Sequence, residues 1–358
     1  MDAESMWEES KGRGITVAVI DGGVDGTLPE LRGKLIKGKN LFSPSKSPYR
    51  DLGGHGTSMA ALIAGSGEEG GIQGLAPESE IIPVTVSPGV VDLFSKIPEA
   101  IDHAVKSGAD IINMSFGGSN REDPAVQAAI DRANKANVLL FAGSGNEGTN
   151  ATAYPAGYAG VVAVGATGES GKVTDFSQYG AHLALAAPGD RMAMRCERNT
   201  ATCLDGKGTS AATAIASASA ALIWSKYPEW TANQVLRVLI DTAGKPKTGE
   251  IPSKYIGYGV VRPRIALADD SIDPGDPDKN PLFSKYYAKQ EEKSDSSEGP
   301  DDGKSGSDIS EEDQKTQGDA SEKDSNSLLV PAIAVGAVAL LGVAVVGVLL
   351  RRRTRVPQ

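Results

Sequence analysis

Cysteine and histidine are scarce in this chain of 358 residues, which contains two cysteines and three histidines. So few ligating side chains argue against a cysteine-rich zinc domain or a framework of several disulfides. His103 lies in a helical pattern and His182 beside a strand pattern, which is typical of structural histidines. His55 stands between Gly54 and Gly56, so its ring is open to approach. It is therefore the one histidine that we consider for catalysis.

Basic patches interleaved with aromatic residues are also absent, so no nucleic-acid partner is expected. The formal net charge is −10, but residues 269–327 alone carry 18 acidic and 7 basic side chains. Residues 1–268 are close to neutral, with 28 acidic and 25 basic side chains. The acidity therefore belongs to one segment and says little about a substrate.

That segment, residues 269–327, is dominated by Asp, Glu, Ser, Lys and Gly and has no hydrophobic period. Such a composition predicts a disordered, self-repelling linker. Residues 328–350 follow with 23 uncharged positions, about 34 Å as a helix, which predicts a transmembrane helix. A buried core helix is the weaker alternative, because nothing that should fold flanks it. The arginines of residues 351–358 predict a cytoplasmic tail and a domain on the outer side of the cell membrane.

The other end of the chain, residues 1–14, is polar and lacks the apolar run of a signal peptide. We treat it as an N-terminal extension, and we expect any export signal to lie upstream of residue 1. Cys196 and Cys203 are seven positions apart in a polar stretch. This spacing favours a disulfide-closed hairpin in an oxidising compartment over two free thiols, and a metal site is not expected without further ligands.

Between these ends, residues 15–268 alternate short apolar strands with helical patterns. Continuous apolar strands separated by helices predict an α/β fold: a doubly wound, mostly parallel sheet with helices on both faces. We expect these strands in 15–21, 81–86, 109–114, 138–142 and 161–165, and helices in 97–106, 124–134 and from Thr231 onward. Right-handed crossovers place the strand carboxyl ends on one rim, where sites are usually built.

Three side chains on or near that rim form a nucleophilic constellation. Asp21 ends the first strand, His55 opens a small-residue helix, and Ser210 opens the long run of small residues to Leu222. Taken singly, each has a structural interpretation: an Asx-turn for Asp21, a buried structural histidine, and a helix N-cap for Ser210. An acid, an imidazole and a hydroxyl in one chain are instead the set needed for acyl transfer.

The motifs around these residues resemble those of the subtilisin family, in order and at plausible spacing. They are Val-Ile-Asp-Gly-Gly-Val-Asp at 19–25, Gly-His-Gly-Thr at 54–57, Gly-Asn-Glu-Gly at 145–148 and Gly-Thr-Ser-Ala-Ala at 208–212. The membrane tail makes the chain most similar to mycosins, membrane-anchored subtilases associated with type VII secretion in actinobacteria.

The resemblance implies a serine endopeptidase in which Asp21, His55 and Ser210 form the triad and Asn146 supplies the oxyanion hole. It also implies that residues 113–118 pair with an extended substrate and that residues 142–146 form the floor of a specificity pocket. The expected substrate-binding residues are Ser115, Phe116, Gly117, Gly143 and Ser144.

No cofactor or catalytic metal is implied, although structural calcium is frequent among relatives. The expected partners are a protein or peptide substrate, the membrane, and membrane components of a type VII secretion system. Two alternatives remain open: a protease-like scaffold with little activity that stabilises a secretion complex, and an esterase that uses the same triad.

Overall fold

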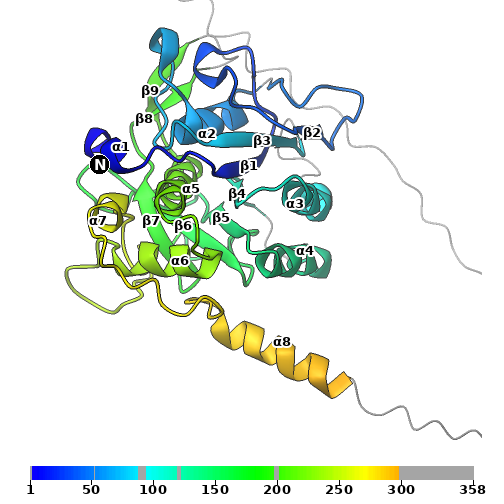
Figure 1. Cartoon of the computed structure of the whole chain (residues 1–358), viewed down its shortest axis with the longest axis vertical. Helices are drawn as coiled ribbons and strands as arrows, with labels where there is room; N and C mark the ends of the chain where they lie inside the picture. Colours follow the sequence, from blue (N-terminus) through cyan, green and yellow to red (C-terminus); the bar gives the residue numbers. More distant parts are fainter. Residues whose placement is uncertain (1, 52, 88–93, 119–121, 197–200, 298–358) are drawn as a thin grey trace, which may run out of the picture. The chain divides into compact units, whose positions relative to one another are not determined.

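The protein, described by a computed structural model over residues 2–51, 53–87, 94–118, 122–196 and 201–297, is built on a seven-stranded sheet (Figure 1). The strands are β1 (Thr16–Asp21), β2 (Lys39–Asn40), β3 (Glu80–Thr85), β4 (Ile111–Met114), β5 (Leu139–Gly143), β6 (Val161–Thr167) and β7 (Leu183–Pro188). Their order is β2-β3-β1-β4-β5-β6-β7, and every pairing is parallel. The predicted α/β architecture is therefore confirmed.

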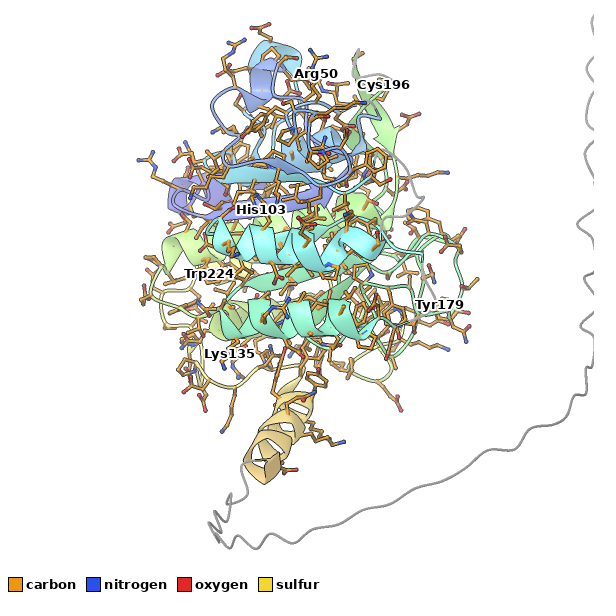
Figure 2. The ribbon with its side chains drawn as sticks, turned by 90° about the vertical axis from the view of Figure 1, so that its right-hand side faces the viewer. Arg50, His103, Lys135, Tyr179, Cys196 and Trp224 are labelled. Carbon is orange, nitrogen blue, oxygen red and sulfur yellow. A yellow bond between two sulfur atoms is a disulfide. The ribbon has the colours of Figure 1, made fainter. Side chains whose placement is uncertain are left out.

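Helices cover both faces of the sheet, and each face has its own apolar core. α3 (Ile97–Lys106) and α4 (Pro124–Lys135) lie on one face, the one that is nearest the viewer in Figure 2. α2 (His55–Ala64), α5 (Thr209–Lys226) and α6 (Ala232–Asp241) lie on the other. Because side chains alternate along a strand, β1 sends Val17 and Val19 into the α5 side and Ala18 and Ile20 into the α3 side.

α5 runs through the middle of the second core, where it packs against β4, β5, β6, β7 and α2. Alanines and serines make up most of the helix, so the strands approach it closely on all sides. Two of its buried hydroxyls are satisfied within the helix: Thr213 donates to the carbonyl of Thr209, and Ser219 to that of Ile215. This arrangement holds the first turn of α5, with Ser210, rigidly over the sheet.

The N-terminal extension is part of the folded domain. α1 (Ala3–Glu9) packs against α7 (Pro263–Leu267), with Met6 1 % exposed. The indole N–H of Trp7 donates to the carbonyl of Leu75 at 2.8 Å. Lys226, the last residue of α5, binds the carboxylates of Glu9 and Asp270 and so joins both ends of the domain.

The chain stays ordered beyond residue 268, which corrects the expectation of a disordered linker that starts at residue 269. Residues 284–297 form α8 (Ser284–Ser297), and the Tyr286 hydroxyl donates to Asp131 of α4 at 3.0 Å. The side chain of Arg237 donates to the carbonyl of Lys279. A few apolar and aromatic residues, Leu282 among them, attach this polar segment to the domain.

The remaining predictions for the C-terminal part lie outside the described residues: the linker from residue 298, the helix 328–350 and the tail 351–358. Within the part of the chain that the structure describes, no helix combines the length and apolarity needed to span a membrane.

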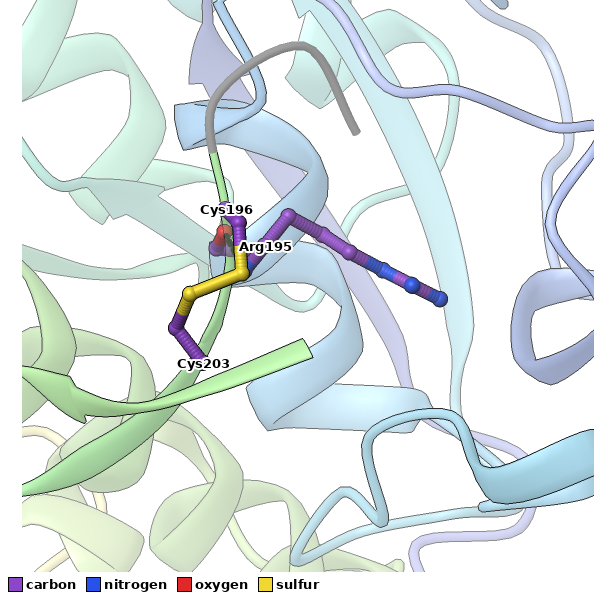
Figure 3. Close-up of a disulfide and its surroundings, with 4 residues drawn as sticks. Arg195, Cys196 and Cys203 are labelled. Atoms are coloured by element: carbon purple, nitrogen blue, oxygen red, sulfur yellow. Dashed lines mark hydrogen bonds between the residues drawn. A yellow bond between two sulfur atoms is a disulfide. The ribbon is translucent and has the colours of Figure 1, made fainter. Parts of the chain in front are cut away.

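A two-stranded antiparallel hairpin, β8 (Met192–Arg195) and β9 (Thr202–Gly206), precedes α5. Cys196 and Cys203 close it with a disulfide, as predicted (Figure 3). The hairpin lies against α2: the backbone N–H of Arg195 donates to the Ser58 hydroxyl at 2.8 Å, and that hydroxyl donates to the carbonyl of Gly54. The Arg195 guanidinium is bound to Glu30, in the short helix η1 (Pro29–Leu31). Two further short 3₁₀ turns are η2 (Glu68–Gly70) and η3 (Phe94–Lys96).

Candidate active site

The carboxyl ends of the central strands surround a cavity of about 300 Å³. β1 pairs with β3 on one side and with β4 on the other, and such a switch in strand order leaves a crevice at the carboxyl ends of a parallel sheet. Asp21 ends β1 at this point. The lining residues are Asp21, Gly22, Asp51, Gly53, His55, Ser87, Ser115, Phe116, Gly117, Gly145, Asn146, Glu147, Thr209 and Ser210.

Asp21 and His55 are hydrogen-bonded to each other. The Nδ1 atom of His55 lies 3.0 Å from Oδ1 and 2.9 Å from Oδ2 of Asp21, so the Nδ1–H donates to the carboxylate. This bond assigns the proton to Nδ1 and leaves Nε2 as the basic nitrogen. The Asp21 charge raises the pKa of His55; burial opposes this, while the Asp21 hydrogen bond and the Asp51 charge add to it. The imidazole is thus a stronger base than an ordinary histidine.

Ser210 is the second residue of α5, and its side chain lines the same cavity. Its hydroxyl donates to the carbonyl oxygen of Ser115 at 2.7 Å. The Ser115 hydroxyl in turn donates to the carbonyl oxygen of Ser210 at 2.9 Å. Among the described residues no hydrogen bond joins Ser210 to His55. The serine therefore shares the cavity with the imidazole while its hydroxyl is turned toward β4.

Asn146 follows β5 and faces the start of α5. Its Oδ1 accepts hydrogen bonds from the Thr209 backbone N–H at 2.8 Å and from the Thr209 hydroxyl at 3.1 Å. Because the oxygen is held in this way, the amide NH₂ is the free end of the side chain, and within the described chain it has no hydrogen-bond partner. The backbone N–H of Ser210, in the first turn of α5, is also without an intrahelical partner. Two N–H groups are therefore available at one end of the cavity.

The predicted substrate-binding residues divide into two groups. Ser115, Phe116 and Gly117 line the cavity. Gly143 and Ser144 lie behind the lining: a Cβ on Gly143 would stand 3.0 Å from the Thr209 hydroxyl, and Ser144 is 0 % exposed. These two residues shape the wall of the cavity from behind instead of forming its surface.

Several lining residues were not singled out from the sequence. Thr209 orients Asn146, and the Glu147 carboxylate accepts the backbone N–H of Asn146 at 3.1 Å. Asp51, just before α2, is buried as well, at 8 % exposed. A signal for Asp51 was present, because Gly53 and Gly54 cannot cap a helix with a side chain and an acid stands just before them.

No cluster of three or more His, Cys, Asp or Glu side chains able to hold a metal occurs within the described ranges. His103 and His182, which were expected to be structural, lie outside the cavity lining. The ring of His103 contacts the carbonyl of Lys37, and burial lowers the pKa of His182.

Comparison with known proteins agrees with this geometry. The sequence model of the Subtilase family matches residues 12–259. The chain belongs to the subtilase family. It is 35 % identical to a subtilisin of Bacillus pumilus over 261 residues, which cover 71 % of this chain and 91 % of that protein. It is 36 % identical to the thermostable alkaline protease of Halalkalibacterium halodurans, over 65 % of this chain and 63 % of that protein.

Solved structures of two proteases resemble the fold as well. MycP1 with its N-terminal propeptide removed aligns with a TM-score of 0.68 and 26 % identity, covering 77 % of this chain and 97 % of MycP1. The MycP3 protease from the type VII (ESX-3) secretion system aligns with a TM-score of 0.64 and 29 % identity, covering 74 % of this chain and 86 % of MycP3. This subtilase is therefore a serine endopeptidase, which confirms the predicted enzyme class. Its similarity to MycP1 and MycP3 agrees with the expected resemblance to mycosins.

Proposed function

We propose that this subtilase hydrolyses peptide bonds of exported proteins through an acyl-enzyme, with Ser210 as nucleophile, His55 as base and Asp21 as its partner. The observation that carries the proposal is the 2.9 Å contact between His55 Nδ1 and Asp21 in the cavity that also holds Ser210. That contact leaves the basic Nε2 of His55 available to accept the Ser210 proton.

The chemistry begins when the Ser210 hydroxyl leaves the Ser115 carbonyl and turns toward His55. Its oxygen then attacks the substrate carbonyl carbon while Nε2 takes the proton. The developing oxyanion is stabilised by the Asn146 amide and the Ser210 backbone N–H, which are already oriented and need not titrate. His55 returns the proton to the leaving amine. Water then attacks the acyl-enzyme with His55 as base, which releases the acyl group as a carboxylic acid and restores the Ser210 hydroxyl.

A fluorophosphonate probe tests this proposal, because it reacts only with a serine that a neighbouring base activates. We expect the purified protein to be labelled and the Ser210→Ala variant not to be. Ser225→Ala, in the same helix but away from the cavity, is the matched control and should be labelled like the wild type. A folded, disulfide-intact protein that no probe labels would favour the protease-like scaffold instead. Turnover of ester but not peptide substrates would favour the esterase.

We further propose that the enzyme is anchored in the cell membrane by residues 328–350, with the domain outside, and works beside a type VII secretion system. The uncharged sequence of that segment and the likeness to MycP3 support this proposal. A protease added to intact cells should remove the domain and leave a short membrane-bound fragment. Recovery of the full chain in the soluble fraction, or a domain that is protected in intact cells, would contradict it.

A further inference from the structure

The helix that carries His55 begins without a capping side chain of its own. Its N-cap is Gly54, in the left-handed region with φ 78°, and His55 is its first residue. The N–H groups of a first helical turn have no partner inside the helix. Here those groups support the residue proposed as base, so whatever binds them also determines where the imidazole lies.

The carboxylate of Asp51 binds them. Its Oδ1 accepts the backbone N–H groups of Gly53 and Gly54, each at 2.9 Å. Its Oδ2 accepts the backbone N–H of Thr57 at 2.9 Å and the Thr57 hydroxyl at 2.7 Å. Thr57 is the third residue of the helix, the position that an N-cap side chain normally reaches. Asp51 thus caps α2 from outside the helix, with a charge placed at the positive end of the helix dipole.

The same network reaches the loop that carries Asp21. The Thr57 hydroxyl, while it donates to Asp51, accepts the backbone N–H of Asp25 at 3.0 Å. The first turn of α2 also packs directly on β1, because a Cβ added to Gly56 would stand 2.9 Å from the Asp21 Cβ. The strand end with Asp21 and the helix start with His55 are therefore joined through Thr57 and Asp51.

From these contacts we propose that Asp51 is a positioning residue of the Asp21–His55 pair, acting through Thr57 to fix the distance between carboxylate and imidazole. The inference rests on the proposed function of that pair. The Asp51 contacts that carry the inference are those with Gly53, Gly54 and Thr57, at the start of the helix that carries His55.

Its charge has a second effect on the same group. The charged side chains that line the cavity with His55 are Asp21, Asp51 and Glu147, and the described lining contains no lysine or arginine. The Asp51 charge contributes to the raised pKa of His55. Loss of that charge should lower the His55 pKa, whereas loss of the Thr57 hydroxyl should leave the charge in place. Geometry and charge can therefore be separated by two variants.

The experiment compares Asp51→Asn, Thr57→Val and Thr57→Ser in the full chain, with kcat, KM and pH profiles measured on one peptide ester. We expect Asp51→Asn to lower kcat by about 10–100-fold with little change in KM, since small displacements of reacting groups have effects of this size. The acid limb of its kcat/KM profile, where the rate rises as His55 deprotonates, should move to lower pH. Thr57→Val should lower kcat and leave the position of the acid limb nearly unchanged. Thr57→Ser should restore the wild-type rate.

Asp110→Asn is the matched control. Asp110 also accepts a backbone N–H, that of Thr16, at 2.8 Å. It precedes β4 and so lies at the amino ends of the strands, opposite the cavity. That variant should leave kcat and the acid limb unchanged. Wild-type kcat and acid limb in Asp51→Asn would overturn the inference while leaving the proposed function intact.

A spectroscopic readout keeps the inference testable without turnover. The Nδ1 proton of His55, hydrogen-bonded to Asp21, should give a downfield proton resonance in the Ser210→Ala protein. We expect Asp51→Asn in that background to broaden or shift it upfield and to lower the pH at which it titrates. If Asp51→Asn does not fold, Thr57→Val and Thr57→Ser decide the matter: equal rates and equal resonances in both would overturn the inference. A wild-type protein that fluorophosphonate does not label would instead refute the proposed function.

Discussion

Ser115 and Ser210 exchange two hydrogen bonds, each hydroxyl donating to the other residue's carbonyl oxygen, at 2.9 and 2.7 Å. The pair joins the carboxyl end of β4 to the first turn of α5. The Ser210 backbone is thus held in place while its hydroxyl donates to a weakly basic carbonyl oxygen. In the proposed mechanism, a rotation of the Ser210 side chain must turn this hydroxyl toward His55.

Ser115→Ala removes one of these bonds and leaves the carbonyl that receives Ser210. It also removes the acceptor of the buried Asn113 side-chain NH₂, now 2.9 Å from the Ser115 hydroxyl. An unpaired buried polar group costs about 1–3 kcal/mol, so we expect the free energy of unfolding in urea to fall by that amount. Ser225→Ala, which removes a hydroxyl from the other end of α5, should cost less. Equal midpoints for the two variants would show that the Ser115 bond adds no stability.

Asn146→Ala should lower kcat by about 10²–10³-fold with KM nearly unchanged, because the lost N–H acts on charge that develops in the transition state. This magnitude was established on subtilisin, a relative of this chain. Thr209→Val, which removes the hydroxyl that binds Asn146 Oδ1 but keeps the Thr209 backbone N–H, should cause a smaller fall. Thr209→Ser retains the hydroxyl and is the control. A change confined to KM would mean that Asn146 binds the ground state.

The rate should depend on pH through His55. Only the neutral imidazole can accept the Ser210 proton, so kcat/KM rises with pH as His55 deprotonates. Because the Asp21 charge raises the His55 pKa, the midpoint of this acid limb should lie above 6.5, the ordinary value for histidine. Asp21→Asn should move the midpoint down and lower kcat by about 10⁴-fold, the loss expected when the wrong tautomer forms. An acid limb below 6.5 in the wild type would contradict this assignment.

The absence of a side chain at Gly117 should leave room for a bulky substrate side chain before the cleaved bond. A Cβ at this position would stand 3.3 Å from the Ala153 Cβ and 3.4 Å from the Gly143 carbonyl oxygen, so an added methyl group would crowd the cavity wall. Gly117→Ala should raise KM about tenfold for peptides with a bulky residue there and have little effect on those with alanine. Gly118→Ala, whose Cβ meets nothing within 4 Å, is the control. Equal effects on small and bulky peptides would place the contact elsewhere.

The ion pair of Glu30 and Arg195 is buried, with side chains 0 % and 8 % exposed. Glu30→Gln leaves an uncompensated buried charge and should lower the free energy of unfolding by about 3–5 kcal/mol, whereas Glu30→Leu with Arg195→Met should be nearly neutral. The exposed pair of Arg132 and Asp102 provides the contrast, and Asp102→Asn should cost about 0–1 kcal/mol. Urea unfolding with the disulfide intact measures all three. Similar losses for the buried and the exposed pair would contradict the account.

Sequence patterns predicted most of the scaffold, because buried parallel strands and small-residue helices have strong periodic signals. The helix expected from Thr231 onward is present as α6, and Thr231 and Gln234 form a capping box at its start. The order at residues 269–297 was missed, because composition averages over a window and does not register a few aromatic anchors such as Tyr286 in a polar segment. The site was predicted as a set of residues, but its fine geometry was not.

Two features explain that limit. The direction of the Ser210 hydroxyl depends on one side-chain rotation, which no residue pattern encodes. The role of Asp51 depends on a turn that brings its carboxylate back onto Thr57, six positions along the chain. Gly143 and Ser144 were recognised from their position in a motif. That they lie behind the cavity lining could not be predicted, because it follows from the packing of Thr209 against Gly143.

The hydrogen bond between Tyr286 and Asp131 fixes where α8 attaches to the domain, and this bears on access to the cavity. Asp131 lies in the last turns of α4, and a Cβ on Gly160, just before β6, would stand 2.6 Å from the Tyr287 hydroxyl. Residues 284–297 therefore attach at the side of the sheet where the strands begin, whereas the cavity that holds Asp21, His55 and Ser210 lies where the strands end. None of the described residues of α8 lines that cavity, so this segment leaves access to it open.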